Sequence, residues 1–93
     1  MQFIKHNLGQ LSGGEIAEVT ITNPAYVRLL DSHNFLMYRS GRRFKYTGGH
    51  YKESPVQIEI PHPGQWYVAV DLAGYAGEVG SDIRILQDAA VSS

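Results

Sequence analysis

The sequence predicts an all-β protein: a single-domain, jelly-roll-like antiparallel β-sandwich of about seven or eight strands with one short helical turn. Its length of 93 residues fits one domain with one modest core. In four segments apolar and polar residues alternate with a period of two, as in half-buried strands. Glycine, proline or asparagine separates most segments at intervals of about 8 to 12 residues, a spacing typical of sandwiches and barrels.

Three strands are expected in the first third of the chain. QFIKHNL at 2–8 and AYVRLLD at 25–31 are candidates on composition. EIAEVTIT at 15–22 shows clear alternation, which places Ala17, Val19 and Ile21 on one face.

The segment DSHNFLMYRSG interrupts this pattern. Asp31, Ser32 and Asn34 can cap a helix, and Gly41 is a good C-terminal cap. We therefore expect a single helical turn near residues 32–39. Its apolar side chains are expected to seal one end of the sandwich: Phe35, Leu36 and Tyr38.

Four more strands are expected after the helical turn. RRFKYT at 42–47 is a weaker candidate, whereas PVQIEI at 55–60 and EVGSDIRIL at 78–86 alternate clearly. In GQWYVAVDL the alternation places Trp66, Val68, Val70 and Leu72 on one face, and Gln65, Tyr67, Ala69 and Asp71 on the other. Trp66 is expected at the centre of the core. The domain spans 1–87, and the small polar tail at 88–93 is expected to fray.

Composition narrows the possible functions and locations. The formal net charge is -1, so attraction to nucleic acid or to anionic membranes requires a local patch. The absence of cysteine removes disulfides and thiolate chemistry, and the N-terminus lacks the apolar stretch of a signal peptide. The longest apolar runs, such as YVAV, are too short to cross a bilayer. We therefore expect a soluble cytoplasmic protein with no membrane partner.

No catalytic, metal or cofactor signature stands out. The histidines at 6, 33, 50 and 62 lack the close spacing of metal ligands. The serines that neighbour glycine lack the context of a nucleophile elbow, and the glycine pairs lack the lysine and helix of a phosphate loop. We expect no enzyme, cofactor or metal, although an enzyme whose site the sequence does not reveal stays an alternative.

The segment YTGGHYKESPV is the candidate recognition loop. The glycine pair permits a tight bend and can turn the side chain of His50 toward a cleft. GYAG, after Asp71, forms a second loop rich in glycine and tyrosine. If the two loops meet at one end of the sandwich, they form a shared ligand-binding cleft. Its expected lining residues are Tyr46, His50, Tyr51, Asp71 and Tyr75. The alternative is that YTGGHYKESPV is only a structural connection between strands.

Five of the eight lysine and arginine residues lie between positions 39 and 52, where no acidic residue intervenes. They form a candidate basic patch of Arg39, Arg42, Arg43, Lys45 and Lys52. Phe44, Tyr46 and Tyr51 are interleaved with these charges, a combination that single-stranded nucleic acid can use. In the alternative, Phe44 and Tyr46 point inward from a strand whose Arg43 and Lys45 face solvent.

Several motifs identify a resemblance that covers nearly the whole chain. GGHY followed by SPV, then GQWYVAVDL and GYAG, resemble the uncharacterised bacterial family called domain of unknown function 1883. The resemblance implies a small β-sandwich, found alone or joined to a Toll/interleukin receptor type domain. It favours a binding or interaction module with a sensing or adaptor role, whose partner is a protein or a small ligand. The family offers no catalytic residues to transfer.

Overall fold

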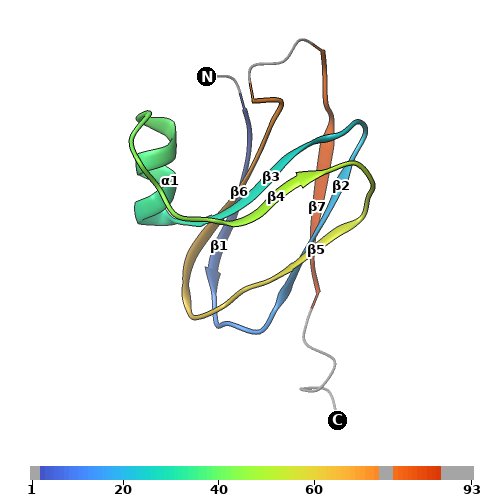
Figure 1. Ribbon diagram of the computed structural model, residues 1–93. Helices are drawn as coiled ribbons and strands as arrows, with labels where there is room; N and C mark the ends of the chain where they lie inside the picture. The colour runs from blue at the N-terminus through green and yellow to red at the C-terminus, as the bar shows by residue number, and fades with distance from the viewer. Residues whose placement is uncertain (1–2, 74–76, 87–93) are drawn as a thin grey trace.

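The computed structural model describes residues 3–73 and 77–86, and within them the chain forms seven strands and one short helix (Figure 1). In chain order, the first elements are the strands β1 (Ile4–Leu11), β2 (Ile16–Ile21) and β3 (Ala25–Asp31) and the helix α1 (Ser32–Arg39). They are followed by β4 (Thr47–Tyr51), β5 (Val56–Glu59), β6 (Gly64–Asp71) and β7 (Ser81–Leu86). The expected tail at 88–93 lies outside the described residues.

The strands form two antiparallel sheets. One contains four strands in the order β1-β6-β3-β4, and the other contains three in the order β5-β2-β7. Among the described elements, only the β3–β4 connection stays within one sheet, and it contains α1. The other connections pass from one sheet to the other, which is how a jelly roll is wound. The predicted antiparallel sandwich is confirmed.

The main core lies between the inner faces of the two sheets. Val19 and Val27 face it from opposite sheets and are fully buried. Trp66 is buried at the same interface, and its indole Nε1 donates a hydrogen bond to the His62 carbonyl oxygen at 3.0 Å. Val68 and Val70 follow on the same face of β6. The inward face predicted for this strand is confirmed.

The other face of β6 differs from a simple half-buried strand. Ala69 and Asp71 are buried although the alternation placed them on the polar face. The cause is α1, which packs against the outer face of the four-stranded sheet and forms a second apolar cluster there with Leu30 and Ala69. Phe35 stacks on Tyr67 with ring centroids 4.4 Å apart. Local alternation cannot reveal that a helix from elsewhere in the chain covers a strand.

The helix itself occupies the predicted range but makes about two turns instead of one. Asp31 caps its N-terminus, since its Oδ1 accepts a hydrogen bond from the Asn34 amide at 2.8 Å. Of the three side chains expected to seal the sandwich, Phe35 and Tyr38 are buried on the outer face of the sheet, whereas Leu36 is 48% exposed. Among the described residues no helix is long and apolar enough to span a membrane.

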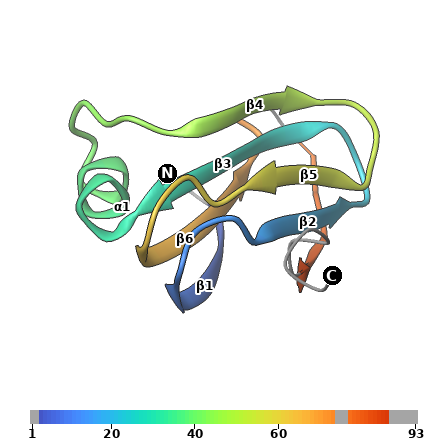
Figure 2. The same ribbon diagram turned by 90° about the horizontal axis from the view of Figure 1, so that it is seen from below.

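The strand expected at 42–47 and the loop expected at 46–56 were wrong in position. Residues 43–46 form no strand, and the presumed loop contains β4, which lies along β3 at the edge of the sheet (Figure 2). A glycine is needed there: at Gly48, whose φ is +128°, a Cβ would lie 2.1 Å from the Val27 carbonyl oxygen. The glycine pair that suggested a bend therefore permits close strand pairing.

Candidate functional site

Arg28 is the centre of the candidate site. Strand alternation on β3 places Tyr26 and Arg28 on the outer face of the four-stranded sheet. Asp71 reaches the same face from the neighbouring β6 and is only 2% exposed. Its carboxylate Oδ2 forms an ion pair with the Arg28 guanidinium, whose side chain is 13% exposed. The negative charge of the buried Asp71 carboxylate is thus compensated by the positive charge of the largely buried Arg28 guanidinium.

The Asp71 carboxylate is held by two further donors. The Tyr38 hydroxyl donates to Oδ2 at 2.5 Å, and the Ala73 amide donates to Oδ1 at 2.7 Å. Burial raises the pKa of Tyr38, and the hydrogen bond to the Asp71 carboxylate raises it further. The Tyr38 hydroxyl therefore stays protonated at neutral pH and remains a donor. Helix α1 is tied to β6 and β3 through this network.

Aromatic rings surround the Arg28 guanidinium. Its Cζ lies 4.6 Å from the ring centroid of Tyr26 and 5.3 Å from that of Tyr46. Tyr38 and Phe44 complete the set at 5.6 and 5.9 Å. Such distances permit cation–π attraction. We call these residues together the Arg28 cluster: Tyr26, Arg28, Tyr38, Phe44, Tyr46 and Asp71.

Three of the five predicted cleft residues come together here. Tyr46 and Asp71 belong to the Arg28 cluster, and the exposed His50 lies beside it, with its ring 5.0 Å from that of Tyr26. Tyr51 is half-buried on the opposite face, where it packs against the main core, so it does not line this surface. Tyr75 lies outside the described residues.

Three members of the cluster were not predicted as site residues from the sequence: Tyr26, Arg28 and Tyr38. Tyr26 and Arg28 were detectable, because both fall on the polar face of the AYVRLLD alternation. Tyr38 was expected only as an apolar seal. Its hydrogen bond to Asp71 joins positions 33 residues apart, and no local pattern contains that information.

The predicted basic residues are all exposed, but they do not form one patch. Four of them lie at the end of α1 and in the connection to β4, and we call them the cationic rim: Arg39, Arg42, Arg43 and Lys45. The Lys45 amide donates to the Asn34 Oδ1 at 2.8 Å, which fixes this connection on the helix. Lys52 follows the far end of β4.

The cations of the rim are also unpaired within the described part of the chain. The two ion pairs there are Arg28–Asp71 and Arg84–Glu18, and neither involves the rim. The rim therefore projects positive charge beside the exposed ring of Tyr46.

A hollow of about 230 Å³ lies at the start of β4. Its wall includes Lys45 and Tyr46, which continue from the cationic rim and the Arg28 cluster. Asp31, His62 and Trp66 line other parts of it. Leu29, like Trp66, belongs to the main core, so the hollow opens at the end of the sandwich, and it is smaller than a typical ligand pocket.

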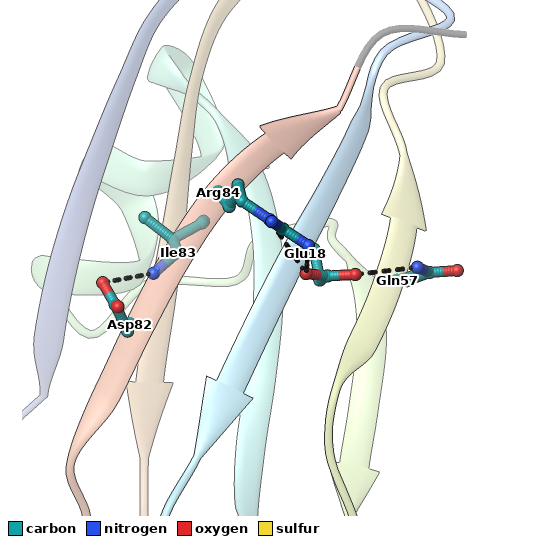
Figure 3. Close-up of polar contacts among 5 residues, drawn as sticks. All are labelled: Glu18, Gln57, Asp82, Ile83 and Arg84. Carbon is teal, nitrogen blue, oxygen red and sulfur yellow. Dashed lines mark hydrogen bonds and ion pairs between the residues drawn. The ribbon is translucent and has the colours of Figure 1, made fainter. Parts of the chain in front are cut away.

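A second polar cluster lies on the outer face of the three-stranded sheet (Figure 3). Glu18, on the central strand β2, accepts hydrogen bonds from Arg84 at 2.7 and 3.1 Å and from Gln57 at 2.9 Å. These contacts lower the pKa of Glu18, with the Gln57 amide contributing most. All three strands are joined by them, so this cluster has a structural explanation. Among the described residues no group of three potential metal ligands gathers.

Comparison with known proteins identifies the family. The model of the domain of unknown function family DUF1883 matches residues 1–89, almost the full length of the chain. No curated protein and no solved structure shows a significant match. The chain therefore belongs to the family known as domain of unknown function 1883.

Proposed function

We propose that the protein is a binding module that recognises an anionic region of a protein partner through the outer face of β3 and β4. The observation that carries this proposal is that Tyr46, a member of the Arg28 cluster that is 44% exposed, directly follows Lys45 of the unpaired cationic rim. Exposed aromatic rings beside arginine are typical of interface hot spots. The buried network beneath them holds this surface rigid before a partner arrives, which lowers the entropic cost of binding.

The proposal assigns no catalytic step to the site. Asp71 is its one buried acid, and Arg28, Tyr38 and the Ala73 amide already occupy its carboxylate oxygens. A general acid or base needs a lone pair or proton that can reach a substrate. The network is better suited to positioning the aromatic rings than to proton transfer.

The proposed setting follows from the sequence. We place the module in the bacterial cytoplasm, where it acts as a sensing or adaptor domain. The uncompensated charge of the cationic rim supports an anionic partner, because opposite charge speeds encounter and orients the two surfaces.

The proposal is tested by capture with matched variants. Immobilised parent protein is compared with the triple variant Arg42→Ala, Arg43→Ala and Tyr46→Ala, and with the control Arg84→Ala on the other sheet. We expect a protein captured from bacterial lysate to bind the parent and the control, and to bind again when purified. Loss of capture only in the triple variant supports the proposal. Equal capture by all three proteins overturns it.

Single-stranded nucleic acid is the second candidate partner. The favouring observation is that the cationic rim and Tyr46 combine free positive charge with an exposed ring. Binding of a fluorescent oligonucleotide must then weaken steeply as salt rises, because bound phosphates release counterions. Arg42→Ala with Arg43→Ala should flatten that slope. If no binding is detected at low salt, this candidate is excluded.

A further inference from the structure

The edges of the two sheets differ in how they are protected against further strand pairing. The edge strands are β1 and β4 in the larger sheet, and β5 and β7 in the smaller. An edge strand has unpaired main-chain N–H and C=O groups, which natural proteins shield with bulges, prolines, charged side chains or short length. The four edges can be compared on these features.

Three of the edges carry such features. β1 contains a bulge between Asn7 and Gly9 and also bears Lys5. β5 has only four residues and lies between Pro55 and Pro61. β7 carries exposed Asp82 and Arg84. Each feature disfavours the addition of another strand.

β4, with five residues, is also short, but it has no bulge, proline or charged side chain. Its sequence, Thr-Gly-Gly-His-Tyr, contains no lysine, arginine, acid or proline, and its pairing with β3 is regular throughout. Thr47, Gly48 and His50 are exposed. Gly49 also presents no side chain on this strand, and nothing lies within 4 Å of the position of a Cβ there. β4 therefore has the most accessible edge of the four.

From this contrast we infer that an extended segment of a partner protein adds to β4 as a new edge strand, with acidic residues at the end that meets Lys45. The inference rests on the proposed function and specifies its partner as an acidic, extended peptide. Main-chain hydrogen bonds to β4 supply affinity in this mode, and side chains on alternate positions supply specificity. On the outer face those side chains would lie beside His50 and the Arg28 cluster.

The charges around β4 favour pairing with an acidic peptide over pairing with β4 of a second copy of the chain. Arg42, Arg43 and Lys45 precede the strand, whereas Lys52 and Glu53 follow it and cancel each other. In an antiparallel pair of β4 strands, the positive end of one copy would meet the neutral end of the other. An acidic peptide gains attraction that self-pairing lacks.

The test uses synthetic probes and the unmodified protein. The first probe is a blocked heptapeptide of alternating threonine and valine followed by two glutamates, so that antiparallel addition to β4 places the glutamates beside Lys45. Two further probes carry N-methyl groups on the backbone of alternate residues. One is methylated at the odd-numbered positions of the peptide and the other at the even-numbered positions. Because alternate N–H groups of a strand point to opposite edges, only one of the two patterns removes the donors that face β4. Binding is measured by titration calorimetry and by amide chemical shifts.

We expect the parent peptide to shift the amides of β4 and to bind about as tightly as one methylated peptide, while the other binds about tenfold or more weakly. A peptide with lysines in place of the glutamates should also bind more weakly. If the acidic peptide does not bind, or if the two methylated peptides behave alike, strand addition is overturned. Capture that depends on Arg42, Arg43 and Tyr46 would still support the proposed function in that case, so the two failures are distinguishable.

Discussion

Asp71 shows how a single residue can serve both stability and recognition. Its carboxylate is buried, and the groups that hold it are Arg28, Tyr38 and the Ala73 amide. When a carboxylate and a guanidinium are buried together on folding, both lose their hydration. This cost offsets most of their mutual attraction, so the ion pair adds little net stability. Losing one partner is different, because the other charge then remains buried alone.

The variant Asp71→Asn tests this role. Asparagine keeps the shape but not the charge, so Arg28 loses its partner, and we expect the free energy of unfolding to fall by about 3 to 5 kcal/mol. Urea denaturation measures the change. The control Asp82→Asn removes an exposed carboxylate on β7 and should change stability by no more than about 0.5 kcal/mol. Equal effects of the two substitutions would contradict the expected cost of leaving Arg28 buried without its partner.

His6 makes stability dependent on pH. Its Nε2 lies 2.7 Å from the Ser81 hydroxyl, which joins β1 to β7 across the sandwich. Burial lowers the pKa of His6 below its usual 6.5, against the opposing effect of Asp82. The unfolded chain therefore binds a proton at a higher pH than the folded chain does, and stability declines as the pH falls through 6.5 toward the lower folded value.

We expect His6→Gln to remove part of this decline. Urea midpoints at pH 7.5, 6.5 and 5.5 compare the two proteins. The lower limit stays above the range in which the stabilising contributions of Glu15 and Glu18, whose pKa values are lowered from 4.5, are lost. Parallel profiles for parent and variant would contradict the assignment to His6, since the exposed His33, His50 and His62 remain in both.

At the scale of elements, α1 converts an outer sheet face into a second apolar cluster. Phe35 is buried against the sheet, whereas its neighbour Leu36 is 48% exposed. We expect Phe35→Ala to lower the free energy of unfolding by about 3 to 5 kcal/mol. Leu36→Ala should cost no more than about 0.5 kcal/mol, because it removes few buried contacts. Chemical denaturation of the two variants provides the comparison, and similar losses would mean that α1 packs through a different face.

β4 offers a second matched pair on adjacent glycines. Alanine at Gly48 would place its Cβ against the Val27 carbonyl oxygen in a backbone conformation with positive φ, while Gly49 has open space and no positive φ. We expect Gly48→Ala to destabilise by about 1 to 3 kcal/mol and to loosen the β3–β4 pair. Gly49→Ala should be nearly neutral. Hydrogen exchange at the amides of β4 distinguishes them, and equal exchange in both variants would contradict the close approach at Gly48.

For the whole molecule, period-two patterning was enough to predict the sandwich but not its outer layer. The inward positions of β6 follow from alternation, since each side chain need only point to the correct face. The placement of α1 over β6, and of Tyr38 on Asp71, depends on contacts distant in sequence. The glycine pair in β4 was misassigned to a bend because glycine serves both turns and close strand approach.

Charge is also arranged at the scale of the whole molecule. The cationic rim lies on the side of α1 and β4, whereas exposed acids such as Glu59 and Asp82 lie on the three-stranded sheet. A net charge of -1 therefore conceals a local excess of positive charge at the cationic rim. An anionic surface can attract such a protein by orienting it, although the total charge is slightly repulsive.

Ion exchange tests this asymmetry with two charge reversals of equal size. Arg42→Glu and Arg84→Glu each replace a positive by a negative charge, which lowers the net charge from -1 to -3. The first reversal lies in the cationic rim and the second on β7. We expect the parent and Arg84→Glu to be retained on a cation exchanger at pH 7 and low salt, and Arg42→Glu to elute earlier, because retention depends on the oriented face. Elution of both variants at the same salt concentration would show that net charge, and not the cationic rim, governs how this protein meets an anionic partner.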